Sequence, residues 1–249
     1  MPSDPIFYVV ALIAVILVGI AKGGFSGMGA LGTPLMALVI DPVRAAAILL
    51  PILIVQDVVG VWAFRKTWDK DLLIVMLPAA FVGIFLGWAT ATFVSVSVVE
   101  GMVGGIALLF GLYQLRGQHR LKVSSDAVPS RWFGIPFGIA SGFTSQIAHA
   151  GGPPYQMWAT SRRYDREMFA GTSALYFAAV NWAKVPAYAA LGQFSRDNLI
   201  LSAILLPVAV ISTFAGVWLV RRVSTARFYT LIYTLMVVVG AKLIYDALA

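Results

Sequence analysis

The sequence predicts an all-α polytopic membrane protein built from two inverted-topology repeats, and three observations support this fold class. Hydrophobic residues make up 60% of the 249 residues, charged residues make up only 12%, and the mean hydropathy is +0.87. A soluble domain of this size needs more polar surface than such a chain can supply. The other two observations are a series of long apolar runs and a glycine-rich stretch that occurs twice.

Long apolar runs, separated by short polar segments, predict the membrane-spanning helices. Most of them approach the roughly 20 residues needed to cross about 30 Å of hydrocarbon. The first and fifth runs are shorter, and each precedes a glycine-rich stretch and a further short apolar piece, at 30–40 and 153–159. We therefore expect about 8 full spans plus two half-helices. The runs are 6–21, 45–64, 72–94, 98–115, 132–147, 168–191, 199–220 and 228–248.

The two glycine-rich stretches have related sequences. Residues 21–38 read AKGGFSGMGALGTPLMAL, and residues 141–158 read SGFTSQIAHAGGPPYQMW. In lipid, non-helical backbone is tolerated only where it is buried in protein or lines a cavity. Each stretch therefore predicts a discontinuous or re-entrant helix. Because the break is duplicated, we expect the two copies to form two halves of one site.

A second duplicated motif divides the chain into repeats. Residues 77–87 match residues 206–216 without a gap at five positions, including the Leu-Pro pair that begins each segment. We predict a first transmembrane repeat over 1–115, a polar cytoplasmic linker over 116–131 and a second repeat over 132–249.

Loop charges predict how the repeats are oriented. Segments 65–71, 116–131, 161–167 and 221–227 each carry at least three basic residues, whereas 41–44, 95–100 and 192–197 carry one or none. Cytoplasmic loops of membrane proteins gather Lys and Arg. If each broken segment makes two crossings, all basic loops lie in the cytoplasm and both termini lie outside. The halves then have inverted topology with five crossings each, the arrangement in which secondary transporters build a midplane site.

Several classes of function lack the residues that they need. The chain has no cysteine, which excludes thiolate metal sites and disulfides. It has no metal-ligand cluster, phosphate loop or nucleotide motif, so we expect no cofactor, no metal and no ATP-driven pump. The net charge of +7 resides in short loops, which indicates positive-inside bias and no nucleic-acid partner. The N-terminus, MPSDP, has no basic n-region, so we expect no removable signal peptide.

The paired glycine-rich segments, the alanine-rich helices after them and the repeated LP-x-A motif together resemble the TauE/SafE sulfite exporter family, also called the four-toluene sulfonate uptake permeases. The resemblance covers nearly the whole chain. It implies a multi-pass transporter of the cell membrane that carries small sulfur-containing anions, such as sulfite or short organosulfonates. The family includes exporters and importers, so the resemblance leaves the direction open.

Few polar side chains interrupt the predicted spans, which makes them candidates for an anion site. Gln56 and Asp57 interrupt one helix, and Asn181 and Lys184 interrupt the corresponding helix of the other half. An ionisable group at a helix centre costs roughly 2.5 to 3.5 kcal/mol to insert, so such groups are usually functional. We expect Lys184 to bind the anion and Asp57 to act as a counter-charge or proton acceptor. Alternatively, Asp57 and Lys184 form a buried pair that only joins helices.

The breaks supply the other candidates. The half-helix starts at Gly32, Thr33 and Gly152 would offer unpaired backbone N–H groups and a positive dipole to an oxyanion. Gln146 and His149 accompany the second break, and His149 could donate to the anion or carry a coupling proton. The alternatives are close helix packing for the glycines and a structural hydrogen bond for His149. Lys22, at the end of the first run, could reach the break, but we favour charge complementarity at the helix C-terminus or a position near the interface.

Two other functions use the same residues. An anion channel could share the site, and Ser145 with His149 could form the nucleophile and base of an intramembrane hydrolase. The hydrolase is a remote alternative, because the chain has no GxSxG elbow and no orienting acid near the two residues. We therefore expect a protein that is not an enzyme, whose partners are a small anion and the lipid bilayer. The oligomeric state stays open, a homo-oligomer included.

Overall fold

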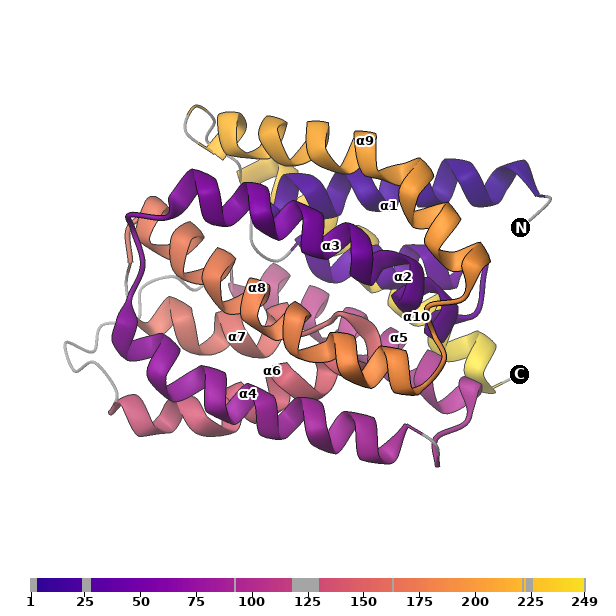
Figure 1. Cartoon of the computed structure of the whole chain (residues 1–249), viewed down its shortest axis with the longest axis horizontal. Coiled ribbons are helices and arrows are strands. Elements are labelled where there is room, and N and C mark those ends of the chain that lie inside the picture. The colour runs from indigo at the N-terminus through magenta and orange to yellow at the C-terminus, as the bar shows by residue number, and fades with distance from the viewer. Residues whose placement is uncertain are drawn as a thin grey trace.

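The computed structural model describes residues 4–23, 28–91, 93–117, 130–162, 164–220, 222 and 226–248. Every element within these residues is a helix (Figure 1). Most of the predicted linker and of the basic loop 221–227 lies outside the described residues. The elements are α1 (Pro5–Lys22), η1 (Met28–Leu31), α2 (Gly32–Ala37), α3 (Pro42–Phe64), α4 (Lys70–Thr90), α5 (Val96–Gly117), η2 (Arg131–Phe133), α6 (Gly134–Ala148), α7 (Gly152–Ala159), η3 (Thr160–Arg162), α8 (Arg166–Ala190), α9 (Arg196–Val220) and α10 (Ala226–Leu248).

The helices have the length and surface of a multi-pass membrane protein. Among the described residues, five helices are long and apolar enough to cross a membrane, namely α1, α3, α4, α5 and α9. Helices α8 and α10, with 25 and 23 residues, have a comparable length. Large apolar side chains such as Trp62, Leu109 and Ile211 point outward, where a soluble protein would carry polar groups. The all-helical membrane prediction is confirmed, and the number of about 8 full spans stays a prediction.

Aspartate side chains define where four of the helices begin. Asp4, Asp41, Asp69 and Asp165 precede α1, α3, α4 and α8, and each carboxylate accepts a hydrogen bond from a backbone N–H of the first turn. These N–H groups have no partner within the helix, so a side-chain oxygen stabilises the start by about 1 kcal/mol. Aspartates in the short polar segments therefore determine where these four apolar helices begin.

Both glycine-rich stretches form broken helices, as the sequence predicts. In the first, α1 ends at Lys22, and η1 and α2 then pack back against α1. In the second, α6 ends at Ala148, His149 adopts the left-handed conformation with a φ of 52°, and α7 begins at Gly152. The N–H of His149 bonds to Ser145 O and that of Ala150 bonds to Thr144 O, which closes the end of α6. The two breaks thus place short helical pieces inside the bundle (Figure 1).

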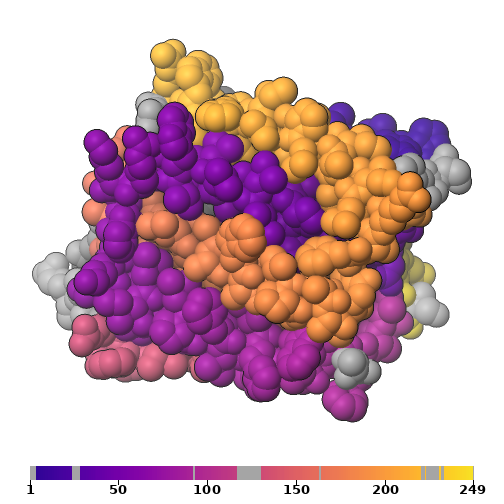
Figure 2. All heavy atoms as spheres, in the orientation of Figure 1, coloured from indigo at the N-terminus to yellow at the C-terminus, as the bar shows by residue number. Residues whose placement is uncertain are grey.

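The first long helix of each predicted repeat packs on a helix of the other predicted repeat. Helix α1 packs on α9 and α6 packs on α4, while α5 packs on α10. Glycines allow the close approach: a Cβ atom at Gly142 would lie 1.9 Å from Ala80 O, and one at Gly23 would lie 2.4 Å from the carbonyl carbon of Gly216. The space-filling view shows another cross-half contact, with α8 between α3 and α4 on one face (Figure 2). The halves are therefore interlocked.

The loops gather at two ends of the bundle. The α3–α4 connection lies at one end, whereas the α8–α9 connection lies at the other end with both chain termini (Figure 1). Single cysteines introduced into this cysteine-free chain test which end is outside. We expect Gln193→Cys to react with an impermeant thiol reagent in intact cells and Lys66→Cys to react only after permeabilisation. Labelling of both positions from the same side would contradict the orientation that the loop charges predict.

Candidate functional site

Residues beside both breaks line one cavity, which we call the central cavity and which lies among α1, α2, α3, α6, α7 and α8. Its volume is about 80 Å³, far below the roughly 300 to 1,000 Å³ of pockets for drug-sized ligands, so it suits a small ion. Its apolar wall includes Val18, Leu49 and Phe177. Its polar lining comes from α1, α2, α6, α7 and α8 and consists of Lys22, Thr33, Ser145, His149, Gln156, Ser173 and Asn181.

Lys22 is the lysine that borders this cavity. Its Nζ donates to Asp57 Oδ1 at 2.5 Å and lies 5.2 Å from the centre of the Phe177 ring. Asn181 Nδ2 donates to the other carboxylate oxygen at 2.6 Å, so both oxygens of the buried Asp57 are satisfied. An ammonium group has three donors, and the bond to Asp57 leaves two of them for a ligand.

This position of Lys22 differs from the interfacial one that we expected from the sequence. The end of α1 lies directly against α3, since a Cβ atom at Gly60 would be 3.3 Å from Lys22 O. Gly60 is about one helical turn from Asp57, so the lysine side chain reaches the carboxylate within the bundle. The ion-pair partner of Asp57 is consequently Lys22, and the expected alternative of a pair between Asp57 and Lys184 is wrong.

Lys184 lies behind the cavity wall, where it holds the second break. Its Nζ lies 3.0 Å from Ser145 Oγ, 3.2 Å from Ser145 O and 2.6 Å from His149 Nδ1. His149 Nε2 is 2.7 Å from Ala46 O. Because a carbonyl oxygen can only accept, Nε2 carries the imidazole proton and Nδ1 accepts from the lysine. All three ammonium donors are therefore used within the protein, and Lys184 fixes the geometry of the break.

The same bonds do not pair Ser145 with His149 as a nucleophile and its base. Both ring nitrogens of His149 have other partners, and no hydrogen bond joins its ring to the Ser145 hydroxyl among the residues that the structure describes. A hydrolase needs the base within hydrogen-bond reach of its nucleophile.

The remaining residues predicted for the site divide into two groups. Thr33 and Gly152 line the cavity, together with His149 and Asn181. Three others lie elsewhere. Gly32 packs on Val18, Gln56 Nε2 turns to Val15 O and Ala209 O at 3.5 Å each, and Gln146 lines a second cavity of about 120 Å³.

The predicted anion-binding residues did not include four polar residues that line the cavity, namely Lys22, Ser145, Gln156 and Ser173. Gln156 lies four residues after Gly152 in α7, and residues four apart share a helical face. This spacing, within a motif already considered as a half-site, was the signal available. For Lys22, the signal was its place immediately before the first glycine-rich break.

The start of α7 supplies fewer backbone donors than a helix start usually does. Pro153 and Pro154 have no N–H, and the N–H of Tyr155 bonds to Gly151 O. In the first turn of α7, the N–H of Gly152 makes no hydrogen bond to the described residues and is the backbone donor available to a ligand. The side chains of the cavity must therefore provide most of the hydrogen bonds to an anion.

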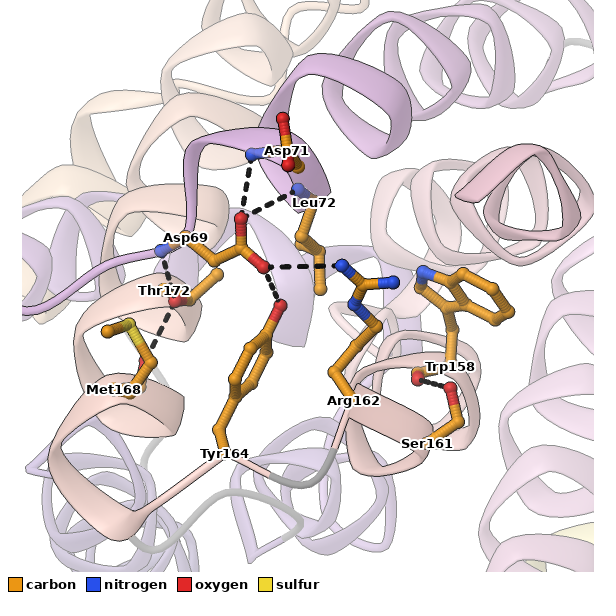
Figure 3. A network of polar contacts seen from close by, with 9 residues as sticks. All are labelled: Asp69, Asp71, Leu72, Trp158, Ser161, Arg162, Tyr164, Met168 and Thr172. Carbon is orange, nitrogen blue, oxygen red and sulfur yellow. Dashed lines mark hydrogen bonds and ion pairs between the residues drawn. The ribbon is translucent and has the colours of Figure 1, made fainter. Parts of the chain in front are cut away.

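A second polar cluster joins the start of α4 to the segment between η3 and α8 (Figure 3). It includes Asp69, in the α3–α4 connection, which lies at the end of the bundle that the loop charges assign to the cytoplasm (Figure 1). The Asp69 carboxylate caps α4, accepts a hydrogen bond from the Tyr164 hydroxyl and lies 3.8 Å from Arg162 Nη2. The Asp69 N–H donates to Thr172 Oγ1 at 2.9 Å. Burial by itself would raise the pKa of Asp69, but the hydrogen bonds and the charge of Arg162 outweigh burial and lower it. Burial and the bond to Asp69 raise the pKa of Tyr164 to about 12.

The lowered pKa of Asp69 predicts a pH-dependent contribution to stability. A carboxyl group with a depressed pKa stabilises the folded state above its unfolded pKa, and this stabilisation is lost as the pH falls through the folded value. We expect Asp69→Asn to lower the melting temperature of the purified protein at pH 7. This difference from the wild type should begin to shrink near the ordinary Asp value of 3.8 and should disappear as the pH falls through the lower pKa of folded Asp69. A difference that is the same at every pH would show that the ionised carboxylate is not responsible.

A comparison with protein-family models matches residues 11–243 to the family described as sulfite exporter TauE/SafE. The matched region contains both breaks and every residue that lines the central cavity. Comparisons with curated proteins and with solved structures gave no match.

Proposed function

Because the chain belongs to the sulfite exporter TauE/SafE family, we propose that it is a secondary transporter of small anions, with sulfite or a short organosulfonate as substrate. The observation that carries this proposal is the small cavity at which both broken helices meet, with the Lys22 ammonium at its wall. Secondary transporters with inverted repeats bind their substrates at such discontinuous helices. The protein would work in the cell membrane.

The chemistry of the cavity suits an oxyanion with a compact apolar part. Lys22 supplies a positive charge, and Thr33, Gly152 and Gln156 supply neutral donors around it. Hydrogen bonds in which one partner is charged are roughly twice as strong as neutral ones, so an anion gains most from these groups. The apolar wall formed by Val18, Leu49 and Phe177 would accommodate a short alkyl group.

The packing of the helices supports two inverted repeats, over 1–115 and 132–249. Helices α4 and α9 contain the repeated Leu-Pro motif, and each packs on the first helix of the opposite half. A twofold relation between inverted halves produces such exchanged pairs. Motion of one half against the other would then open the cavity alternately to the two sides.

A closed layer between two cavities favours a carrier over a channel. His149 borders the central cavity and Tyr188 borders the second one, which is also lined by Leu191 near one end of the bundle. Their rings stack with centres 5.8 Å apart, and Tyr188 OH donates to Gln146 O at 2.9 Å. A carrier requires such a barrier on one side of its substrate at each stage of transport.

We further propose that Asp57 accepts a coupling proton and that His149 is the second candidate for this role. The ionised Asp57 carboxylate repels an anion and competes with it for Lys22. A proton on Asp57 removes both effects, so that proton and anion would be bound together. Asp57→Asn should then retain anion binding and change its dependence on pH.

Flux measurements in proteoliposomes test the function directly. The panel consists of sulfite, sulfate, thiosulfate, sulfoacetate, taurine and non-sulfur carboxylates. We expect saturable uptake of a sulfur oxyanion that responds to an imposed pH or ion gradient. Non-saturating flux without coupling would favour a channel, and a preference for a neutral or cationic compound would contradict the proposed substrate class.

A further inference from the structure

Two buried polar groups at the wall of the central cavity have no hydrogen-bond partner among the residues that the structure describes. Gln156 Nε2 and Thr33 Oγ1 make no hydrogen bond to any described residue, although the two side chains are only 6% and 2% exposed. Leaving a buried donor unsatisfied costs about 1 to 3 kcal/mol. Both residues line the cavity, which makes a ligand bound there the candidate partner for these two atoms.

The orientation of the Gln156 amide is set by two helices outside the broken segments. Gln114 Nε2, on α5, lies 3.4 Å from Gln156 Oε1 and 2.8 Å from the hydroxyl of Tyr233, on α10. An amide nitrogen has two protons, so Gln114 can donate to both oxygens. With its oxygen engaged by Gln114, Gln156 presents its NH₂ group as the unpartnered one.

We propose that Gln156 determines substrate specificity and that Gln114 is a positioning residue that keeps the Gln156 NH₂ group available to the anion. This inference rests on the proposed function. With Lys22 and Thr33, Gln156 offers donors on three different elements, α1, α2 and α7. Such a set matches a headgroup with three oxygen atoms better than a carboxylate with two. A site built to hydrogen-bond its substrate discriminates strongly against analogues that leave its groups unpaired.

Sulfite binding to the full-length protein in lipid nanodiscs tests the role of Gln156, with acetate as the two-oxygen competitor. We expect Gln156→Leu to weaken sulfite binding by about tenfold or more and to change acetate binding much less. Met157→Leu is the matched control, since the neighbouring Met157 is 45% exposed, and it should bind sulfite as the wild type does. Equal losses for sulfite and acetate would overturn the specificity role.

A double-mutant cycle tests the role of Gln114. A merely structural effect of Gln114→Leu would add to the effect of Gln156→Leu, whereas a positioning role would not. Gln114→Leu should lower the preference for sulfite over acetate in the wild type and should have no further effect once Gln156→Leu is present. Additive losses would overturn the positioning role.

If the leucine variants fail to fold, Gln156→Glu provides the test of the same inference. It keeps the size and polarity of the side chain but replaces the donor with a negative charge, so it should abolish sulfite binding. Unaltered sulfite binding in Gln156→Glu would refute the inference while leaving the transporter proposal in place. A wild-type protein that binds no anion of the transport panel would instead refute the proposed function.

Discussion

Replacing Lys22 with methionine is expected to weaken sulfite binding by roughly a hundredfold or more, which is the largest effect that we predict for a single side chain. The substitution removes the ammonium group at the cavity wall and leaves the buried Asp57 carboxylate without its ion-pair partner. Both changes raise the free energy of the bound anion, because an unpaired carboxylate at a site of low dielectric repels it. Calorimetric titration of the purified protein with sulfite measures the loss.

Two further variants test the effect of the unpaired Asp57 carboxylate and the role of the second buried lysine, Lys184. Adding Asp57→Asn to Lys22→Met removes the unpaired carboxylate, so part of the sulfite affinity should return. Lys184→Met should lower the melting temperature and should weaken sulfite binding less than Lys22→Met does. Lys184 does not line the cavity and instead anchors Ser145 and His149. From the sequence alone we expected Lys184 to be the main anion ligand, so that Lys184→Met would weaken anion binding more than Lys22→Met. A larger loss of sulfite affinity in Lys184→Met than in Lys22→Met would support that expectation.

Replacing Gly152 with leucine is expected to abolish transport while the protein still folds. Among the described residues, no atom beyond the adjacent residues and the backbone of α7 lies within 4 Å of a Cβ atom added at Gly152, and the residue borders the central cavity. The leucine side chain would therefore extend into a space of about 80 Å³ and exclude the substrate. Flux in proteoliposomes and the melting temperature of the same preparation test the two parts of this prediction.

Other glycines provide the controls for this experiment. At Gly142, a Cβ atom would lie 1.9 Å from Ala80 O, so Gly142→Leu should force α4 and α6 apart and prevent folding. At Gly32, the nearest atom is Val18 Cγ2 at 2.4 Å, so Gly32→Leu tests packing of the first break and not the cavity. If Gly152→Leu loses its fold as Gly142→Leu does, the effect at Gly152 is also one of packing.

Sequence patterns predicted the broken helices because the signals for them are local. Glycines and prolines interrupt the apolar runs at the positions where α1 and α6 end. A helix end depends mainly on the residues within one turn of it, and those residues can be read directly. The pairing of the two breaks in one cavity also followed from their duplication, since non-helical backbone within a membrane must be enclosed by protein.

By itself, the sequence determined the all-helical membrane class, the two breaks and the presence of Thr33, His149, Gly152 and Asn181 near them. Only the tertiary structure decided which lysine borders the cavity and which amide there has an NH₂ group without a partner among the described residues. Lys22 meets Asp57 across 35 residues, and Gln114 meets Gln156 across 42. Such pairs depend on the rotation and depth of whole helices against one another, which uniformly apolar runs leave undefined because their faces are equally suited to lipid and to protein.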